Sequence, residues 1–490
     1  IFWRRNFYPK DPAAIPYKNL KSEQSLEFKE DFMQGIFDLI SELKLDIPFF
    51  SPRYMAHMVS ETNLPAIFSY FATMLYNPNN VSSEASPVTL DYELQVGKDF
   101  ANLFGYDQNM SFGHLTSGGT VANYESLFYN KTMKLLPVAI GIGLFSKNIR
   151  WPSFFPKTIW ELMNIDYAVM DNILEEMENY LRENNSSLNE VIKEFSYAEL
   201  GERKFIKLAQ AFFKEEFPEF GVILPTTAHY SWSRSANLFS IGKDNYLKVE
   251  VDHNFTMIAE SYEKVLEKCL KEKFVVIQTI GVFGSTEFSN FDPIDKITSI
   301  RSKYRKLGLF SPIHIDAAYG GYYPAMFKEG PKLPYAKELL GDSYVNLRNS
   351  SAALAETESI TIDPHKMGFV PYGAGAIVFK HGSFKEFIAE KAEYVFSVKD
   401  KDGSLSDQFQ LGKYILEGSK PGAVASSVYF SNKMIPLNYD GYGSLLFELC
   451  KITKSFNKLL HEFNSKSDDW IFIPAGEPEA NIQWNLLKRF

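Results

Sequence analysis

Short apolar runs recur between residues 91 and 385, and small or polar residues follow most of them. Five of the runs are continuously apolar rather than alternating, which is typical of strands buried on both faces of a parallel sheet. Helical segments lie between them, so the pattern predicts βαβ repetition and a large, open α/β sheet. The five runs are residues 221–230, 273–281, 313–320, 359–366 and 375–380.

Four segments have apolar residues at helical spacing and are predicted to be helices. They are residues 23–44, 64–78, 261–273 and 292–308. The segment 64–78 is apolar nearly all round, which predicts a buried helix. We expect Asp292 to cap the last helix, Pro293 to occupy its first position and Gly308 to follow its end.

The same pattern predicts three parts. Residues 1–90 are expected to form an N-terminal helical segment, and residues 91–385 the large sheet domain. Residues 386–490 mix helical segments with short apolar runs, which predicts a smaller C-terminal α+β domain. Only 124 residues follow Lys366, and the chain stops in what looks like the middle of a strand, so we expect C-terminal or loop residues to be absent.

Composition narrows the classes of function. The 490 residues are 45% hydrophobic, which is enough for a large core, and the net charge is −9. Lysines and arginines are scattered among acidic residues without a basic stripe, which argues against nucleic acid as a partner. The two cysteines, Cys269 and Cys450, build neither a disulfide framework nor a zinc site, so we expect a reducing, cytoplasmic compartment. No run of 18 apolar residues occurs, and no membrane span is expected.

Three polar residues close three of the predicted strands, at the edge where ligands bind such sheets: His229, Asp316 and Lys366. A lysine desolvated at this edge loses proton affinity and becomes the amine nucleophile that Schiff-base chemistry needs. The alternative is a lysine that extends to solvent. A buried carboxylate at Asp316 needs a partner, and a protonated pyridine nitrogen is one. The alternatives are a turn cap or a metal pair with His314.

A glycine-rich turn before a predicted helix offers a phosphate cradle: Ser117, Gly118, Gly119 and Thr120. Glycines let an anion approach backbone N–H groups, and the helix N-terminus favours negative charge. The alternative is a simple helix cap. An imidazole such as that of His229 could stack on a planar cofactor ring; the alternative is a hydrogen-bonded histidine of the core.

Taken together, the turn, the histidine, the aspartate and the lysine follow the order of a known family. The chain resembles the fold-type I, pyridoxal phosphate (PLP)-dependent amino-acid decarboxylases of group II, which include glutamate, aromatic amino-acid and bacterial tyrosine decarboxylases. The resemblance covers nearly the whole chain, and segments 76–89 and 391–396 are most similar to the tyrosine branch. The other segments that carry it are TSGGTVANYESL (116–127), AHYSWSRSA (228–236), GSTEFSNFDPI (284–294), HIDAAYGG (314–321), DPHKMGFVPYGAG (363–375) and YILEGSKPGA (414–423).

The resemblance implies a fold like that of aspartate aminotransferase, with a large, mostly parallel sheet domain, a smaller C-terminal domain and PLP as cofactor. It implies that Lys366 binds the cofactor aldehyde, that Asp316 keeps the ring nitrogen protonated, and that His229 stacks on the ring opposite Ala318. Thr286 would lie near the phenolic oxygen of the cofactor or the substrate carboxylate. The residues implied to bind the phosphate are Ser117, Gly118, Gly119 and Thr120, helped by Asp363 and His365.

Two further roles follow from the resemblance. Gly418 and Ser419 resemble the segment that reaches the phosphate of a neighbouring subunit, which implies an obligate homodimer with a shared site. Tyr394 resembles the loop tyrosine that returns a proton to the substrate carbon after CO2 has left. The alternative for Tyr394 is a tyrosine that anchors a helix end.

The implied activity is decarboxylation of an L-amino acid to its amine and CO2, with tyrosine favoured as the substrate. Aspartate and glutamate are alternatives, because related decarboxylases share the same cofactor motifs. A PLP lyase acting on another C–C bond, a transaminase and a non-catalytic relative are further alternatives, and the identity of the product separates them.

Overall fold

The computed structural model describes residues 10–12, 15–54, 58–59, 61–329, 341–389, 409–467, 469–474, 478–483 and 485–489. The chain forms two units, residues 1–56 and 57–490. The first unit contains the short helix α2 (Tyr17–Leu20) and the long helix α3 (Glu23–Glu42). Ser22 caps α3, because its side chain accepts a hydrogen bond from the backbone N–H of Ser25.

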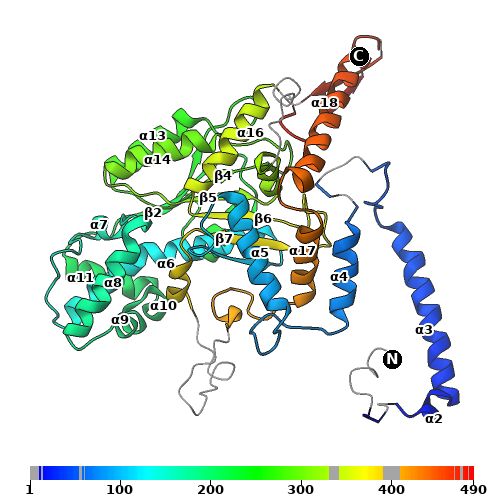
Figure 1. The fold of residues 1–490 in the computed structure, drawn as a ribbon. Coiled ribbons are helices and arrows are strands. Elements are labelled where there is room, and N and C mark those ends of the chain that lie inside the picture. The colour runs from blue at the N-terminus through cyan, green and yellow to red at the C-terminus, as the bar shows by residue number, and fades with distance from the viewer. Residues whose placement is uncertain are drawn as a thin grey trace. The chain divides into compact units, whose positions relative to one another are not determined.

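A seven-stranded sheet lies at the centre of the second unit (Figure 1), in the order β1-β7-β6-β5-β4-β2-β3. The neighbouring strands from β6 across to β3 pair in parallel, whereas β7 is antiparallel to both β6 and β1. The strands are β1 (Phe112–Thr116), β2 (Phe220–Pro225), β3 (Tyr246–Val249), β4 (Val275–Val282), β5 (Ile313–Ala317), β6 (Ser359–Ile362) and β7 (Gly375–Phe379). A separate hairpin joins β8 (Trp470–Pro474) to β9 (Asn485–Arg489).

The prediction of a large, mostly parallel α/β sheet is confirmed, and each of the five predicted runs contains a strand. The direction expected for β7 was wrong. The connection from β6 to β7, residues 363–374, contains no helix, so the chain does not cross over and re-enters the sheet from the edge it has just left. This connection carries Lys366.

Helices cover both faces of the sheet. The longest, α6 (Gly119–Ser146), packs on one face with the helices that gather at one end of the unit in Figure 1. On that face lie also α7 (Ile159–Met163), α8 (Tyr167–Glu183), α9 (Leu188–Phe195), α10 (Tyr197–Leu200), α11 (Glu202–Phe213) and α12 (Ser231–Leu238). The other face is covered by α5 (Thr89–Phe104), α13 (Ala259–Glu272), α14 (Ile294–Lys306), α16 (Asp342–Ala353) and α17 (Gly422–Met434).

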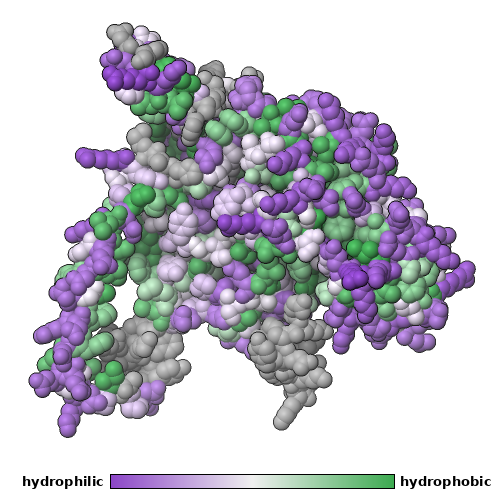
Figure 2. All heavy atoms as spheres, turned by 180° about the vertical axis from the view of Figure 1, so that it is seen from behind, coloured by the Kyte–Doolittle hydropathy of each residue, from purple (hydrophilic) through white to green (hydrophobic). Residues whose placement is uncertain are grey.

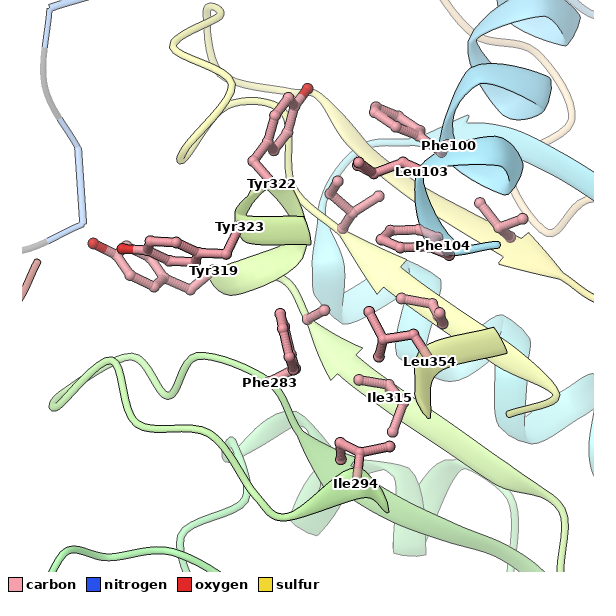
Figure 3. Packing of buried hydrophobic residues seen from close by; sticks show 14 of the residues in the cluster. Phe100, Leu103, Phe104, Phe283, Ile294, Ile315, Tyr319, Tyr322, Tyr323 and Leu354 are labelled. Carbon is pink, nitrogen blue, oxygen red and sulfur yellow. The ribbon is translucent and has the colours of Figure 1, made fainter. Parts of the chain in front are cut away.

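Alternate residues of the strands point to opposite cores, as the pleat requires. Ile313 and Ile315 of β5 belong to the core that includes α5, whereas His314 and Asp316 face α6. Figure 3 shows part of the first core, where Phe100, Leu103 and Phe104 of α5 point toward the strands. Beside them, Tyr319, Tyr322 and Tyr323 come from η2 (Gly320–Phe327) and the residue before it.

Two local predictions were wrong. Helix α4 (Leu64–Met74) is not a buried helix: Ala66 is its one buried residue, and Phe68 is 67% exposed. It packs against α17 along one side, so an apolar circumference did not mean burial within this chain. Asp292 does not cap α14; its carboxylate accepts the backbone N–H groups of Met257 and Val282 instead, and Pro293 stands at the cap position.

The C-terminal part also contains α18 (Ser444–Asn464). The three-part division at residues 90 and 385 stays a prediction. In the described part of the chain, we find no helix with the length and apolarity needed to cross a bilayer.

The contact between α5 and β1 gives a stability prediction. A methyl group on Gly97 would come within 2.1 Å of the carbonyl oxygen of Gly113. We expect Gly97→Ala to lower the free energy of unfolding by about 1–3 kcal/mol, because the clash is with backbone that cannot turn aside. The measurement is urea denaturation followed by tryptophan fluorescence. The control is Lys98→Ala at the next, exposed position, which should change stability by about 0.5 kcal/mol or less; equal effects would contradict the prediction.

Candidate active site

The predicted site residues lie at one edge of the sheet. Strands β1, β2, β5 and β6 run in the same direction, so their carboxyl ends meet there. The glycine-rich turn follows β1, His229 follows β2, Asp316 lies near the end of β5, and Lys366 follows β6. This is the edge at which open α/β sheets bind ligands.

The turn after β1 leads directly into α6, which begins at Gly119. Within the described residues, no side chain caps this helix, so its first N–H groups point toward the edge without a side-chain acceptor. A methyl group on Gly119 would lie 2.9 Å from Oδ2 of Asp363 and 3.0 Å from Cβ of Ala318. The residue is therefore small because two predicted site residues lie against its backbone.

Strand β7 reaches the same turn from the opposite direction. Its first residue, Gly375, pairs with Thr116, the last residue of β1. A methyl group on Gly375 would come within 2.5 Å of Cα of Gly118. Gly375 thus lets the chain that follows Lys366 lie against the backbone of the turn.

Lys366 is largely buried, and its Nζ lies 3.0 Å from Oδ2 of Asp363. Burial by itself lowers the pKa of the ammonium group, but the negative charge of Asp363, with a contribution from Asp316, outweighs burial and raises it. The expectation that this lysine loses proton affinity at the edge was wrong for the chain without cofactor. The reason is the carboxylate three residues before it.

Asp363 and His365 flank the lysine. Asp363 is 2% exposed, and among the described residues no donor reaches its Oδ1. The Nδ1 atom of His365 is 2.8 Å from the carbonyl oxygen of Ala374. Burial lowers the pKa of His365 although Asp363 opposes the shift, so the imidazole is neutral at neutral pH. A neutral ring bonded through Nδ1–H presents Nε2 as an acceptor on its other side.

Asp316 is 7% exposed, and its Oδ1 accepts the backbone N–H of Ala318 at 3.3 Å, while its Oδ2 accepts two further hydrogen bonds. Its Oδ2 accepts hydrogen bonds from Nδ2 of Asn123 at 2.8 Å and from Nε1 of Trp232 at 3.2 Å. The alternative of a metal pair with His314 gains no support, because the described ranges contain no group of three metal-ligating side chains. His314 is bound instead to Ser359 and Asn123.

His229 is half-buried in the loop between β2 and α12. Its Nδ1 lies 3.0 Å from the hydroxyl of Ser231 and accepts the backbone N–H of the same residue. Burial lowers the pKa of His229, and the charges of Asp316 and Lys366 act on the ring in opposite directions. The histidine, aspartate and lysine therefore influence one another across a common space.

Three further predicted residues, Thr286, Gly418 and Ser419, lie in loops. Thr286 is half-buried in the loop between β4 and α14. Gly418 has a φ of 65°, and the Ser419 hydroxyl accepts a hydrogen bond from Nδ2 of Asn79. Tyr394 lies outside the described residues.

Sequence reasoning missed residues that support the site. Asn123 follows Gly119 by four positions, so it lies on the same face of α6, and this spacing was the available signal. No signal pointed to Trp232. Glu417 was missed too: its carboxylate accepts the backbone N–H of Ser117 and so joins the 414–423 segment to the glycine-rich turn of the same chain.

These features fit pyridoxal 5'-phosphate. The uncapped start of α6 suits a phosphate group, and the largely buried lysine suits an aldehyde. The aspartate beneath the edge suits a pyridinium nitrogen, because a buried carboxylate is stabilised by a cationic partner.

Comparison with known proteins points to the same chemistry. Residues 221–468 match the pyridoxal-dependent decarboxylase conserved domain. The chain is 35% identical to an L-tyrosine decarboxylase of Levilactobacillus brevis, over 90% of this chain and 68% of that protein. It is 34% identical to an L-tyrosine decarboxylase of Enterococcus faecalis, over 95% of this chain and 72% of that protein. A probable L-aspartate decarboxylase of Pyrococcus furiosus is 27% identical, over 58% of this chain and 62% of that protein.

Solved structures share the fold. Mouse CSAD in its apo form matches with a TM-score of 0.57 at 16% identity, covering 98% of this chain and 75% of that one. The tryptophan decarboxylase of Catharanthus roseus, solved with L-tryptophan, matches with a TM-score of 0.56 at 12% identity, covering 97% and 77%. At these identities the likeness establishes the fold.

The contact between Lys366 and Asp363 predicts a pH effect. Only the neutral amine attacks an aldehyde, so the rate at which the cofactor-free protein reacts with pyridoxal should rise with pH as Lys366 loses its proton. Because Asp363 raises the pKa of this ammonium group, Asp363→Asn should move the midpoint of the rate profile to lower pH. The measurement is the initial absorbance change on mixing, at a series of pH values. Glu176→Gln, an exposed carboxylate of α8, is the control and should leave the midpoint in place; a shift to higher pH for Asp363→Asn would contradict the prediction.

Proposed function

Since the chain belongs to the family of pyridoxal-dependent decarboxylases, we propose that it converts L-tyrosine to tyramine and CO2. The observation that supports this substrate is the extent of the likeness. Three L-tyrosine decarboxylases are 32–35% identical over 90–98% of the chain. The relatives named for aspartate are 26–29% identical over about half of it.

Bound at the sheet edge, PLP supplies an aldehyde that condenses with amines and a ring that accepts the electron pair released when the carboxylate leaves. Lys366 would hold the aldehyde and would be the group that the substrate amine replaces. The glycine-rich turn, Ser117 to Thr120, would bind the phosphate through its hydroxyls and through the backbone N–H groups that follow Ser117, helped by Asp363 and His365. The N–H of Ser117 itself donates to Glu417. The contacts with the phosphate fix where the ring lies, which is the precondition for aligning the bond that breaks.

Asp316 and His229 hold the ring from different directions. The carboxylate of Asp316 would accept a hydrogen bond from the ring N–H and stabilise its positive charge, which is the preorganised electrostatic stabilisation that such a reaction needs. His229 would lie against one face of the ring and Ala318 against the other. Thr286 would lie near the phenolic oxygen of the cofactor or the substrate carboxylate.

The carbon that loses CO2 must receive a proton. We assign this step to the Tyr394 hydroxyl, with His229 as the second candidate. Tyr394 lies outside the described residues, so its support is the A-x-Y-V-F sequence that surrounds it. The amine of Lys366 would then be the group that binds the aldehyde again as the product amine leaves.

We propose also that the protein works in the cytoplasm as a homodimer whose subunits share their sites through Gly418 and Ser419. The support within the second unit is an apolar surface, formed where α4 packs against α17. Figure 2 shows hydrophobic side chains, in green, gathered along α4 toward the left of that view. An apolar surface of this kind is typical of protein contacts. Its exposed residues are Leu64, Phe68, Phe71, Met74, Phe430 and Met434.

The first prediction here concerns the substrate. The PLP-loaded protein should release CO2 and tyramine from L-tyrosine, and Lys366→Ala should lose this activity. The measurement is CO2 release with identification of the amine, using tyrosine, phenylalanine, DOPA, glutamate and aspartate. β-Alanine or γ-aminobutyrate as the main product would replace the proposed substrate while keeping the reaction. A bound cofactor without CO2 from any of them would favour a lyase acting on another C–C bond or a transaminase.

The second prediction concerns the assembly. The purified protein should sediment as a dimer, and Phe68→Ser combined with Phe71→Ser should give a monomer, because two large apolar side chains leave the contact. Leu307→Ser removes an exposed apolar side chain elsewhere and serves as the control. A monomeric parent protein would exclude the homodimer, and a dimeric double variant would exclude the α4 surface as the contact.

A further inference from the structure

Helix α6 and the centre of the sheet meet through buried polar side chains. Asn123, Ser126 and Asn130 lie on one face of the helix, since they are three and four residues apart. Opposite them, Asn130 donates to Oε1 of Gln278 at 2.8 Å, and Ser126 lies 3.5 Å from the same oxygen. We call this set the polar seam. Its members are Asn123, Ser126, Asn130, Gln278, His314, Ser359 and Thr361, each at most 1% exposed.

Asn123 is the member of the polar seam that touches Asp316. A carboxylate only accepts hydrogen bonds, so the Asn123 amide must turn its Nδ2 toward Oδ2 of Asp316. The amide oxygen of Asn123 then points the other way and accepts from the hydroxyl of Thr361 at 2.9 Å and from Nε2 of His314 at 3.2 Å. The orientation of this amide is thus determined by its neighbours on both sides.

His314 completes the arrangement. Burial lowers its pKa to about 4, so the ring is neutral at neutral pH. With its proton on Nε2, directed at Asn123, the ring has an acceptor at Nδ1, which lies 2.8 Å from the hydroxyl of Ser359. Every hydrogen bond from Ser359 through His314 and Asn123 therefore donates in the direction of Asp316. Hydrogen bonds in such a chain polarise one another.

The same amide group has a second contact on the site. Nδ2 of Asn123 lies 3.3 Å from the hydroxyl of Ser231, which in turn lies 3.0 Å from Nδ1 of His229. One side chain thus links the predicted partner of the ring nitrogen to the predicted stacking residue. Trp232, next to Ser231, supplies the other N–H donor to Oδ2 of Asp316.

We propose that Asn123 is a positioning residue for the decarboxylation, acting through Asp316. It fixes Oδ2 of the carboxylate from the α6 side, with Trp232 as the second donor, so that the negative charge is held in one orientation toward the ring nitrogen. The inference rests on the proposed function, which gives Asp316 that role. Loss of Asn123 would leave Oδ2 with Trp232 as its one donor, while Oδ1 keeps the backbone N–H of Ala318. The carboxylate would be held less rigidly, and the ring nitrogen would hold its proton less firmly.

The polar seam offers a matched control in Asn130. It is an asparagine on the same face of α6, it is equally buried, and its Nδ2 also donates to a sheet oxygen at 2.8 Å. It does so two turns away from Asp316. Asn130→Ala therefore reproduces the loss of a buried seam hydrogen bond without touching the carboxylate.

The experiment loads the parent protein, Asn123→Ala and Asn130→Ala with PLP labelled with 15N in its ring, and records the nitrogen resonance. We expect the resonance of Asn123→Ala to move from the pyridinium position toward that of neutral pyridine, and that of Asn130→Ala to stay with the parent. We also expect kcat of Asn123→Ala to fall about 10- to 100-fold, the effect of losing a hydrogen bond to a charged group, with KM nearly unchanged. An unmoved resonance in Asn123→Ala, or equal shifts in both variants, would overturn the inference.

Two further variants separate the possible failures. Trp232→Phe removes the other donor to Oδ2 and keeps an aromatic ring in place, so it should move the resonance in the same direction. This variant replaces Asn123→Ala if Asn123→Ala does not fold. An unmoved resonance in Trp232→Phe would then count against the inference. Asp316→Ala tests the assignment on which the inference rests. If Asp316→Ala leaves the resonance and kcat as in the parent, the proposed role of Asp316 is wrong. If Asp316→Ala shifts them and Asn123→Ala does not, the positioning role alone is wrong.

Discussion

The polar seam between α6 and the sheet is the constraint on which the site depends. A buried polar group without a partner costs about 1–3 kcal/mol, and the seam contains seven polar side chains. Helix α6 can make its seam hydrogen bonds together only in one position along the strands. These bonds join Asn130 with Gln278, and Asn123 with Thr361 and Asp316. That position places the start of the helix at the carboxyl edge. The place of the phosphate cradle is therefore set by contacts along the helix as well as by the turn itself.

The charge state of Lys366 at the sheet edge depends on a close ion pair. Burial and pairing act on Lys366 in opposite directions, and the carboxylate of Asp363 decides the outcome because it lies 3.0 Å from the amine. A strand-end lysine that is merely buried would be a ready nucleophile. Here the same four-residue turn, 363–366, that presents the lysine also contains the carboxylate that holds its proton. The same carboxylate lies farther from His365, with 3.7 Å between Oδ2 and Nε2, and burial lowers the pKa of both His229 and His365.

Much of the fold could be predicted because the central strands are buried on both faces and are continuously apolar. Strand β1 was missed because glycine and histidine interrupt it, and β3 because it is a short edge strand with an exposed lysine. The direction of β7 has no signature in its sequence, since its residues are as apolar as those of a parallel strand. The exposure of α4 was missed because periodicity reports an apolar surface and not what covers it.

The residues of the site also differ in whether the sequence could reveal them. Lys366, Asp316 and the glycine-rich turn could be found because each belongs to a short local motif at a strand end. Asn123 and Trp232 could not be assigned to Asp316, because they lie 193 and 84 residues from it along the chain and only the packing of α6 and α12 brings them together. Residues that bind are marked by their neighbours in sequence, whereas residues that position them are marked by neighbours in space.

The meeting of Gly97 and Gly113 limits how this protein can vary. The atoms that a larger residue at either position would strike belong to the backbone of the other. Most tight contacts in a core can be relieved when one side chain grows and its neighbour shrinks. Here neither partner has a side chain to give up, so no second substitution within the pair can compensate for the first. A larger residue at either position would require α5 to move away from β1, and this movement would open the core between them.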